Sequence, residues 1–176
     1  NQAISLDLKK AAAYNNLGIV YSFLKDYSKA IDCYRHAIVF DPDDALAYSN
    51  LGDTYIECGD YLNAIKYFEL AISVDPGHAL AYYNLGIANG KLGSYEIALS
   101  FFEKFLRIAP SDKQYKPLKD KVRSERIPKI KKLLEQKRRT RILFSVPANA
   151  SSPVGAAVTT KSTSNLEKMS PSFSVN

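Results

Sequence analysis

The sequence lacks the features that define several large classes of proteins. No uninterrupted apolar run approaches the roughly 18 residues of a membrane-spanning helix, which argues against an integral membrane protein and a membrane partner. No basic segment followed by an apolar core opens the sequence, so no secretory signal is expected. The two cysteines, Cys33 and Cys58, are too few for a disulfide framework. They favour a reducing, cytoplasmic setting.

The sequence motifs of common enzyme active sites are also missing. Residues 90–94 (GKLGS) do not follow the order of a phosphate-binding loop, and there is no His-Glu-x-x-His motif or nucleophile elbow. Cys33 and His36 are three residues apart and could share a helix face, but zinc takes three or four ligands. We therefore expect no enzyme, no catalytic residue, no metal site and no cofactor.

Charge divides the chain into regions of opposite sign. Residues 1–112 hold 9 Lys/Arg against 14 Asp/Glu, whereas residues 113–141 hold 13 Lys/Arg against 3 Asp/Glu. The net charge of +6 therefore describes neither region. An acidic body followed by a basic segment indicates two parts with different roles.

A repeat of 34 residues accounts for most of the acidic body. Segments 11–44, 45–78 and 79–112 align without a gap. Their first halves share the pattern Tyr14, Leu17, Gly18, Tyr21, then Tyr48, Leu51, Gly52, Tyr55, then Tyr82, Leu85, Gly86, Asn89. Their second halves share Ala30, Tyr34, Ala37, Pro42, then Ala64, Phe68, Ala71, Pro76, then Ala98, Phe102, Phe105, Pro110.

This pattern resembles the tetratricopeptide repeat family, with Tyr in the usual Trp position. The resemblance covers 102 of the 176 residues, and it implies an all-α solenoid of stacked antiparallel helix pairs. Asn89 in place of Tyr and Phe105 in place of Ala are departures in the third repeat, as expected near the end of an array.

The physical pattern of each repeat agrees with a helix pair. Apolar residues follow helical spacing, and a glycine inside each first helix predicts close approach of a neighbouring helix. The dipeptides Lys25-Asp26, Gly59-Asp60 and Gly93-Ser94 predict the turn within each pair. Asp41-Pro42, Asp75-Pro76 and Ala109-Pro110 predict the end of each second helix, because a residue before proline disfavours the helical conformation.

Both ends of the array are predicted from the same alignment. Residues 1–10 match the last turns of a second helix, so we expect the end of a truncated preceding repeat and an uncapped apolar face beside the first full repeat. Self-association through that face is an open alternative. Residues 113–141 predict a basic capping helix or extension, with a narrow apolar stripe interrupted at Pro128. Residues 142–176 are rich in Ser and Thr and predict a disordered tail.

The resemblance implies a concave groove lined by the first helix of each pair. The candidate groove residues are Asn15, Asn16, Ile19, Phe23, Ser49, Asn50, Asp53, Glu57, Tyr83, Asn84, Ile87 and Lys91. Asn16, Asn50 and Asn84 occupy the same position in successive repeats, and amide side chains can pair with both N–H and C=O groups of an extended peptide. This is similar to the asparagine-ladder grooves of O-linked GlcNAc transferases.

The expected function is a non-catalytic scaffold that binds a peptide segment of a partner protein. Two alternatives stay open: the substrate-recognition segment of a larger enzyme such as a glycosyltransferase, and nucleic-acid contact through the basic segment at residues 113–141. The basic run at residues 137–141 could also act as a nuclear-localisation signal. The chaperone-binding members of the family hold a C-terminal carboxylate with Lys, Asn and Arg. Here Asn15, Ile19, Leu80 and Asn84 stand at those positions, so a chaperone C-terminus is not the expected ligand.

Overall fold

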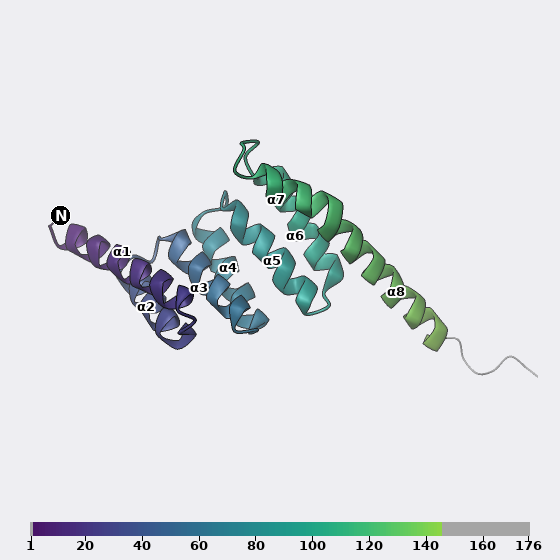
Figure 1. Cartoon of the computed structure of the whole chain (residues 1–176), viewed down its shortest axis with the longest axis horizontal. Coiled ribbons are helices and arrows are strands. Elements are labelled where there is room, and N and C mark those ends of the chain that lie inside the picture. The colour runs from purple at the N-terminus through teal and green to yellow at the C-terminus, as the bar shows by residue number, and fades with distance from the viewer. Residues whose placement is uncertain (1, 146–176) are drawn as a thin grey trace, which may run out of the picture.

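The computed structural model describes the backbone of residues 2–145 and the side chains of residues 5–141. This part of the chain is built from helices, without a strand (Figure 1). The elements are α1 (Gln2–Phe23), α2 (Tyr27–Phe40), α3 (Ala45–Glu57), α4 (Tyr61–Val74), α5 (Ala79–Lys91), α6 (Tyr95–Ile108), α7 (Lys116–Lys121), the π-helical turn η1 (Val122–Arg126) and α8 (Ile127–Ser145). Within these residues no helix is both long and apolar enough to cross a membrane.

The helices form stacked antiparallel pairs, which confirms the predicted all-α solenoid. The pairs α1–α2, α3–α4 and α5–α6 make the most extensive contacts, and α2–α3 and α4–α5 join successive pairs. The row runs from α1 to α6, and α8 lies across its far end (Figure 1). Each second helix ends where the proline motif predicts, at Phe40, Val74 and Ile108.

The turn within each pair has the same backbone conformation in all three repeats. Lys25, Gly59 and Gly93 have φ values of 60°, 77° and 74°, in the left-handed region that glycine enters without a steric penalty. The next helix then begins with a capping residue, and Asp26 and Asp60 accept hydrogen bonds from the backbone N–H groups of Lys29 and Asn63. The dipeptides Lys25-Asp26 and Gly59-Asp60 therefore end one helix and cap the next, whereas Ser94 of the third turn makes no side-chain capping bond.

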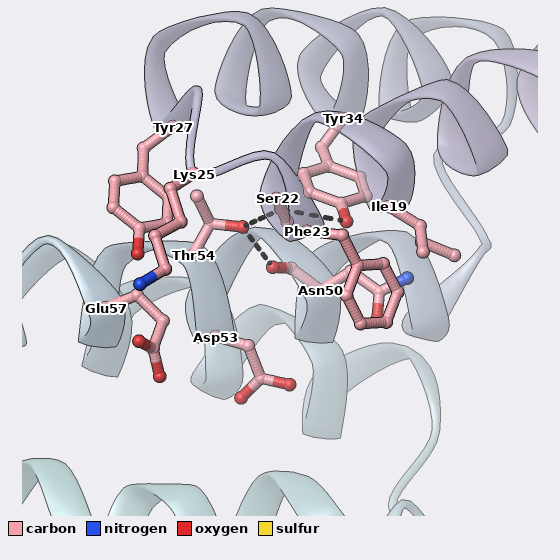
Figure 2. A pocket seen from close by; sticks show the side chains of 10 residues that line it. All are labelled: Ile19, Ser22, Phe23, Lys25, Tyr27, Tyr34, Asn50, Asp53, Thr54 and Glu57. Carbon is pink, nitrogen blue, oxygen red and sulfur yellow. Dashed lines mark hydrogen bonds between the residues drawn. The ribbon is translucent and has the colours of Figure 1, made fainter.

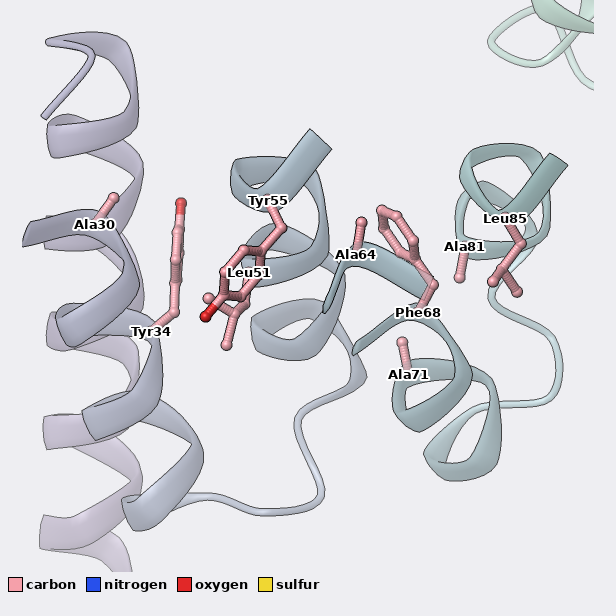
Figure 3. Packing of buried hydrophobic residues seen from close by; sticks show 9 residues of the cluster. All are labelled: Ala30, Tyr34, Leu51, Tyr55, Ala64, Phe68, Ala71, Ala81 and Leu85. Carbon is pink, nitrogen blue, oxygen red and sulfur yellow. The ribbon is translucent and has the colours of Figure 1, made fainter. Parts of the chain in front are cut away.

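A ring from the second helix of each pair fills the space above the glycine inside the first helix. A Cβ atom added at Gly18, Gly52 or Gly86 would lie 2.6–2.7 Å from the ring of Tyr34, Phe68 or Phe102 respectively. These rings are almost completely buried. Figure 3 shows Tyr34 and Phe68 between successive helix layers, beside Leu51 and Leu85. The close approach predicted from the glycines is present, and the approaching group is an aromatic ring.

The N-terminal end differs from the expected helix boundary. Residues 2–10 do not form a separate helix end, because α1 continues unbroken from Gln2 to Phe23. Leu8 stands where the later repeats have proline, and leucine permits the helix to continue. The predicted apolar face is exposed: Leu17 and Val20 are 42% and 51% accessible. That residues 1–10 belong to a preceding repeat stays a prediction.

The C-terminal extension covers the last repeat, but with different boundaries from those predicted. Val122, Ile130 and Leu134 are buried, so the covering surface reaches well into α8. Pro128 does not interrupt the helix: the π-turn η1 immediately precedes it, Ile127 donates its backbone N–H to the carbonyl of Val122, and the chain continues into α8 without a break. The helix also extends to Ser145, so the predicted start of the tail at residue 142 is four residues too early. Residues 146–176 lie outside the described part.

Candidate functional site

A pocket of about 360 Å³ opens between α1 and α3, at the turn that leads into α2. Figure 2 shows the side chains that line it. They are Ile19, Ser22, Phe23, Lys25, Tyr27, Tyr34, Asn50, Asp53, Thr54 and Glu57. We call this cavity the α1–α3 pocket. It combines an aliphatic and aromatic wall with amide, hydroxyl and carboxylate groups, which is the usual composition of a binding site.

A hydroxyl network fixes the inner wall of the α1–α3 pocket. The hydroxyl of Ser22 lies 3.1 Å from that of Thr54 and 3.4 Å from that of Tyr34 (Figure 2). Thr54 also donates to the backbone carbonyl of Asn50, one turn earlier in α3. Three helices are therefore joined at this point, so the pocket is largely formed before any ligand arrives.

The asparagines are linked to the preceding repeat by hydrogen bonds. Asn50 donates from its side-chain amide to Oδ1 of Asn15, at 3.0 Å. Asn84 donates to Oδ1 of Asp53, at 2.5 Å. Each amide uses one of its two N–H groups in these bonds, and an amide carries a second N–H and a carbonyl oxygen as well. The bonds therefore orient Asn50 and Asn84 without using their full pairing capacity.

Two carboxylates lie one turn apart on the groove side of α3. Asp53 and Glu57 are both accessible to solvent, and Figure 2 shows both in the opening of the pocket. Asp53 is open to solvent on one side, but the protein atoms around it still desolvate its carboxyl. This desolvation and the charge of Glu57 raise the pKa of Asp53 to about 7, although the hydrogen bond from Asn84 acts to lower it. Two like charges at this spacing repel each other. Each carboxylate therefore disfavours the ionisation of the other, and a cation placed between them would remove this repulsion.

The structure divides the predicted groove residues into groups. Ile19, Phe23, Asn50, Asp53 and Glu57 line the α1–α3 pocket, and Asn84 binds Asp53 at its edge. Asn16 is exposed on α1. Asn15, Ser49 and Tyr83 are buried, and Tyr83 packs against the rings of Phe102 and Phe105. These three therefore support the groove from within the packed layer, contrary to the expectation that they face a ligand.

Ile87 and Lys91 line a second cavity, which the sequence did not predict. It has a volume of about 290 Å³ and lies between α5 and α8. Arg126 and Lys129 contribute from the C-terminal extension, so three cations surround this cavity. The sequence placed the extension at the end of the array, but nothing in it indicated that the extension also forms a wall of the groove.

Five residues of the α1–α3 pocket were not among the candidate groove residues: Ser22, Lys25, Tyr27, Tyr34 and Thr54. Lys25 and Tyr27 come from the turn between α1 and α2, and Tyr34 comes from α2. A description of the groove that is restricted to the first helix of each pair omits such residues. The tyrosine after each turn dipeptide is a sequence signal that could have identified Tyr27.

The stacked helix pairs and the lined groove define a class of proteins, the helical-repeat modules. Two family models, both described as tetratricopeptide repeat, match residues 11–44 and 43–111. The chain belongs to the tetratricopeptide repeat family. No curated protein matches it significantly.

Solved structures of tetratricopeptide repeat domains share the fold. The first such domain of Spaghetti (RPAP3), bound to the HSP90 peptide SRMEEVD, has a TM-score of 0.63 and 23% identity, over 73% of this chain and 95% of that one. The second domain of the same protein, bound to the same peptide, has a TM-score of 0.59 and 27% identity, over 61% and 99%. The Sgt2 domain from Aspergillus fumigatus has a TM-score of 0.57 and 24% identity, over 84% and 90%.

Proposed function

We propose that this chain is a non-catalytic interaction module that binds an extended peptide segment of a partner protein along α1, α3 and α5. The observation that carries the proposal is the α1–α3 pocket, a preformed cavity of about 360 Å³ beside the asparagine of α3. Asn50 and Asn84 lie on successive first helices and are oriented by hydrogen bonds. These two side-chain amides can form hydrogen bonds with the backbone of a peptide, while the pocket selects one of its side chains.

The peptide differs in charge from the one bound by the RPAP3 domains. The HSP90 peptide in those complexes, SRMEEVD, ends in acidic residues. In this chain Asp53 and Glu57 line the groove. The positions where the family's peptide-clamping cations are expected are occupied by Asn15, Leu80 and Asn84. An acidic C-terminus would meet repulsion here instead of charge-assisted hydrogen bonds. We therefore propose a different peptide class.

A displayed library of random peptides, each roughly ten residues long, tests the proposal, because an extended chain of that length spans about 33 Å. Recovered peptides are titrated against the whole chain and against an Asn16→Ala/Asn50→Ala/Asn84→Ala variant. We expect affinity to fall by at least about tenfold, since each side-chain hydrogen bond contributes roughly 0.5–1.5 kcal/mol.

The matched control removes one exposed polar side chain per repeat from the paired helices. In Ser28→Ala/Ser73→Ala/Ser100→Ala all three positions are exposed and outside the pocket lining. This control should bind as the parent does. Peptides with N-methylated backbone amides should bind weakly, because methylation removes the N–H groups that would donate hydrogen bonds to the asparagine side-chain carbonyls. Equal binding by the parent and the asparagine variant would refute the groove assignment.

A further inference from the structure

The α1–α3 pocket carries negative charge with no cation paired to it. Neither Asp53 nor Glu57 forms an ion pair with any side chain of residues 5–141. Lys25 is the one cation among the lining residues and lies on the exposed turn after α1. The hydrogen bond from Asn84 is the polar contact that Asp53 receives from the neighbouring repeat. A ligand cation would supply the missing counter-charge.

The walls of the pocket suit a long cationic side chain. Phe23 is 84% exposed at the rim, which is unusual for a phenylalanine and leaves its ring available for contact. Tyr27, Tyr34 and Ile19 complete the apolar wall (Figure 2). An arginine can pack its aliphatic stem and planar head against aromatic rings while its N–H groups reach two carboxylates. A lysine offers a point charge without the planar fork.

The charge pattern is specific to one repeat. The positions of Asp53 and Glu57 are occupied by Ile19 and Phe23 in the first repeat and by Ile87 and Lys91 in the third. The neighbouring cavity between α5 and α8 is basic, through Lys91, Arg126 and Lys129. The acidic site is therefore local, and a uniformly basic peptide would meet repulsion further along the groove.

From this arrangement we infer that the α1–α3 pocket binds the side chain of one arginine of the partner peptide, between the Phe23 and Tyr27 rings and the carboxylates of Asp53 and Glu57. The inference rests on the proposed function, since it names the chemistry of the peptide that the groove binds. Charge complementarity and the aromatic wall carry it. Arginine binding would also relieve the repulsion between the two carboxylates, because the cation lies near both.

Four pools of synthetic peptides, each roughly ten residues long, test the inference; an extended chain of this length spans about 33 Å. Each pool has one fixed central residue, which is arginine, lysine, citrulline or glutamate, and uncharged residues elsewhere. Citrulline keeps the shape of arginine but removes its charge. Retention on the immobilised whole chain should be about two- to fivefold higher for the arginine pool than for the citrulline pool, as expected for a charge pair at an exposed site.

Variants connect that preference to the pocket. Asp53→Asn/Glu57→Gln should abolish the difference between the arginine and citrulline pools. Glu69→Gln/Glu103→Gln makes the same change in net charge at exposed positions on α4 and α6 and should leave the difference unchanged. Circular dichroism verifies that both variants are folded.

The pH dependence provides a second readout. The facing titratable groups are Glu57 on the same helix, Lys25 on the turn, and Tyr27 and Tyr34 from α2; Asn84 from α5 does not titrate. Because the pKa of Asp53 is about 7, its carboxylate becomes ionised as pH rises through that value. Binding of the arginine pool should strengthen several-fold between about pH 6 and pH 8, and Asp53→Asn should remove this dependence.

The outcomes separate the inference from the proposed function. If the citrulline pool binds as well as the arginine pool, the groove binds peptides but the arginine inference is wrong. If the lysine pool equals the arginine pool, the assignment of a guanidinium is wrong. If no pool is retained above the blank matrix, both the inference and the proposed function fail.

Discussion

At the scale of single residues, the aromatic rings above the helix glycines limit what the array tolerates. In Gly86→Ala the new Cβ would lie 2.7 Å from Phe102, whose ring is 1% exposed and packed against Tyr83. Alanine favours a helix by about 1 kcal/mol over glycine, but overpacking a core costs about 1–3 kcal/mol. We expect a net loss of stability, measured by urea denaturation.

The control for this substitution is Gly77→Ala. Gly77 lies in the loop after α4, and the nearest atom to its Cβ is Oδ1 of the exposed Asp75, at 3.2 Å. A flexible side chain can move, so this variant should remain within about 0.5 kcal/mol of the parent. A Gly86→Ala protein as stable as the parent would show that the ring contact does not constrain the packing.

Asp53 links the candidate site to stability. Its folded-state pKa of about 7 is above the ordinary value of an aspartate, so the protonated carboxyl is favoured in the folded chain. The contribution of Asp53 to the free energy of unfolding is therefore fully present below the ordinary aspartate pKa of about 3.9. It is lost as the pH rises through about 7, because ionisation is unfavourable in the folded chain. Asp53→Asn should therefore stabilise the protein above that range, with a gain that shrinks towards acid pH. Thermal melts across this pH range measure the difference, and a pH-independent difference would contradict the account.

At the scale of helices, the three turns within the pairs differ in whether a side chain caps the next helix. Asp60 accepts hydrogen bonds from the backbone N–H and the side-chain amide of Asn63, at 3.1 and 2.6 Å, whereas Ser94 at the same position makes no side-chain capping bond. Asp60→Ala should cost about 1 kcal/mol, and Ser94→Ala should cost clearly less. Urea denaturation of the two variants gives the comparison, and equal losses would contradict the structure.

The same capping bond has a pH signature. The hydrogen bonds from Asn63 hold the pKa of Asp60 below its ordinary value, so its contribution is present above about pH 4 and is lost as pH falls through the lower, folded-state pKa. The stability difference between Asp60→Ala and the parent should therefore disappear in strong acid.

The helices of the array could be predicted because each boundary has a local cause. The turn dipeptides and the prolines act on their own backbone, and they repeat every 34 residues. The extension beyond Ile108 lacks such repetition, and Val122 and Ile130, on either side of Pro128, pack against the last repeat. Contacts of that kind are tertiary, and a local pattern does not specify them.

The candidate site was predictable only where it lies on the first helices. Asn50 and Asp53 follow from the repeat register. The burial of Ser49 and Tyr83 and the contribution of Tyr27 depend on the angle at which the helix pairs stack. That angle is set by side-chain packing between repeats, so it could not be obtained from spacing alone.

At the scale of the whole molecule, equivalent residues differ because the two ends of the array differ. Leu51 and Leu85 are completely buried against the preceding repeat, whereas the equivalent Leu17 is 42% exposed. Leu51→Ala should cost about 2–5 kcal/mol, because it leaves a cavity in the packed core. Leu17→Ala should cost about 1 kcal/mol or less, because less apolar surface is lost from the interior. Similar losses at the two positions, measured by urea denaturation, would show that another surface covers Leu17 in solution.

The charge of the molecule is arranged along the same axis as the groove. The α1–α3 pocket contains Asp53 and Glu57, and the cavity beside α8 contains Lys91, Arg126 and Lys129. A bound peptide would therefore encounter opposite charges at the two ends. Such a pattern selects orientation as well as sequence.

Chemical-shift mapping locates a bound peptide on the helices of the array. A peptide recovered from the library is titrated into the isotopically labelled whole chain, and the perturbed amides are assigned. We expect perturbations along α1, α3 and α5, including the side-chain amides of Asn50 and Asn84. Perturbations confined to α8 or to the paired helices α2, α4 and α6 would contradict the proposed function, because the peptide would then bind outside the groove.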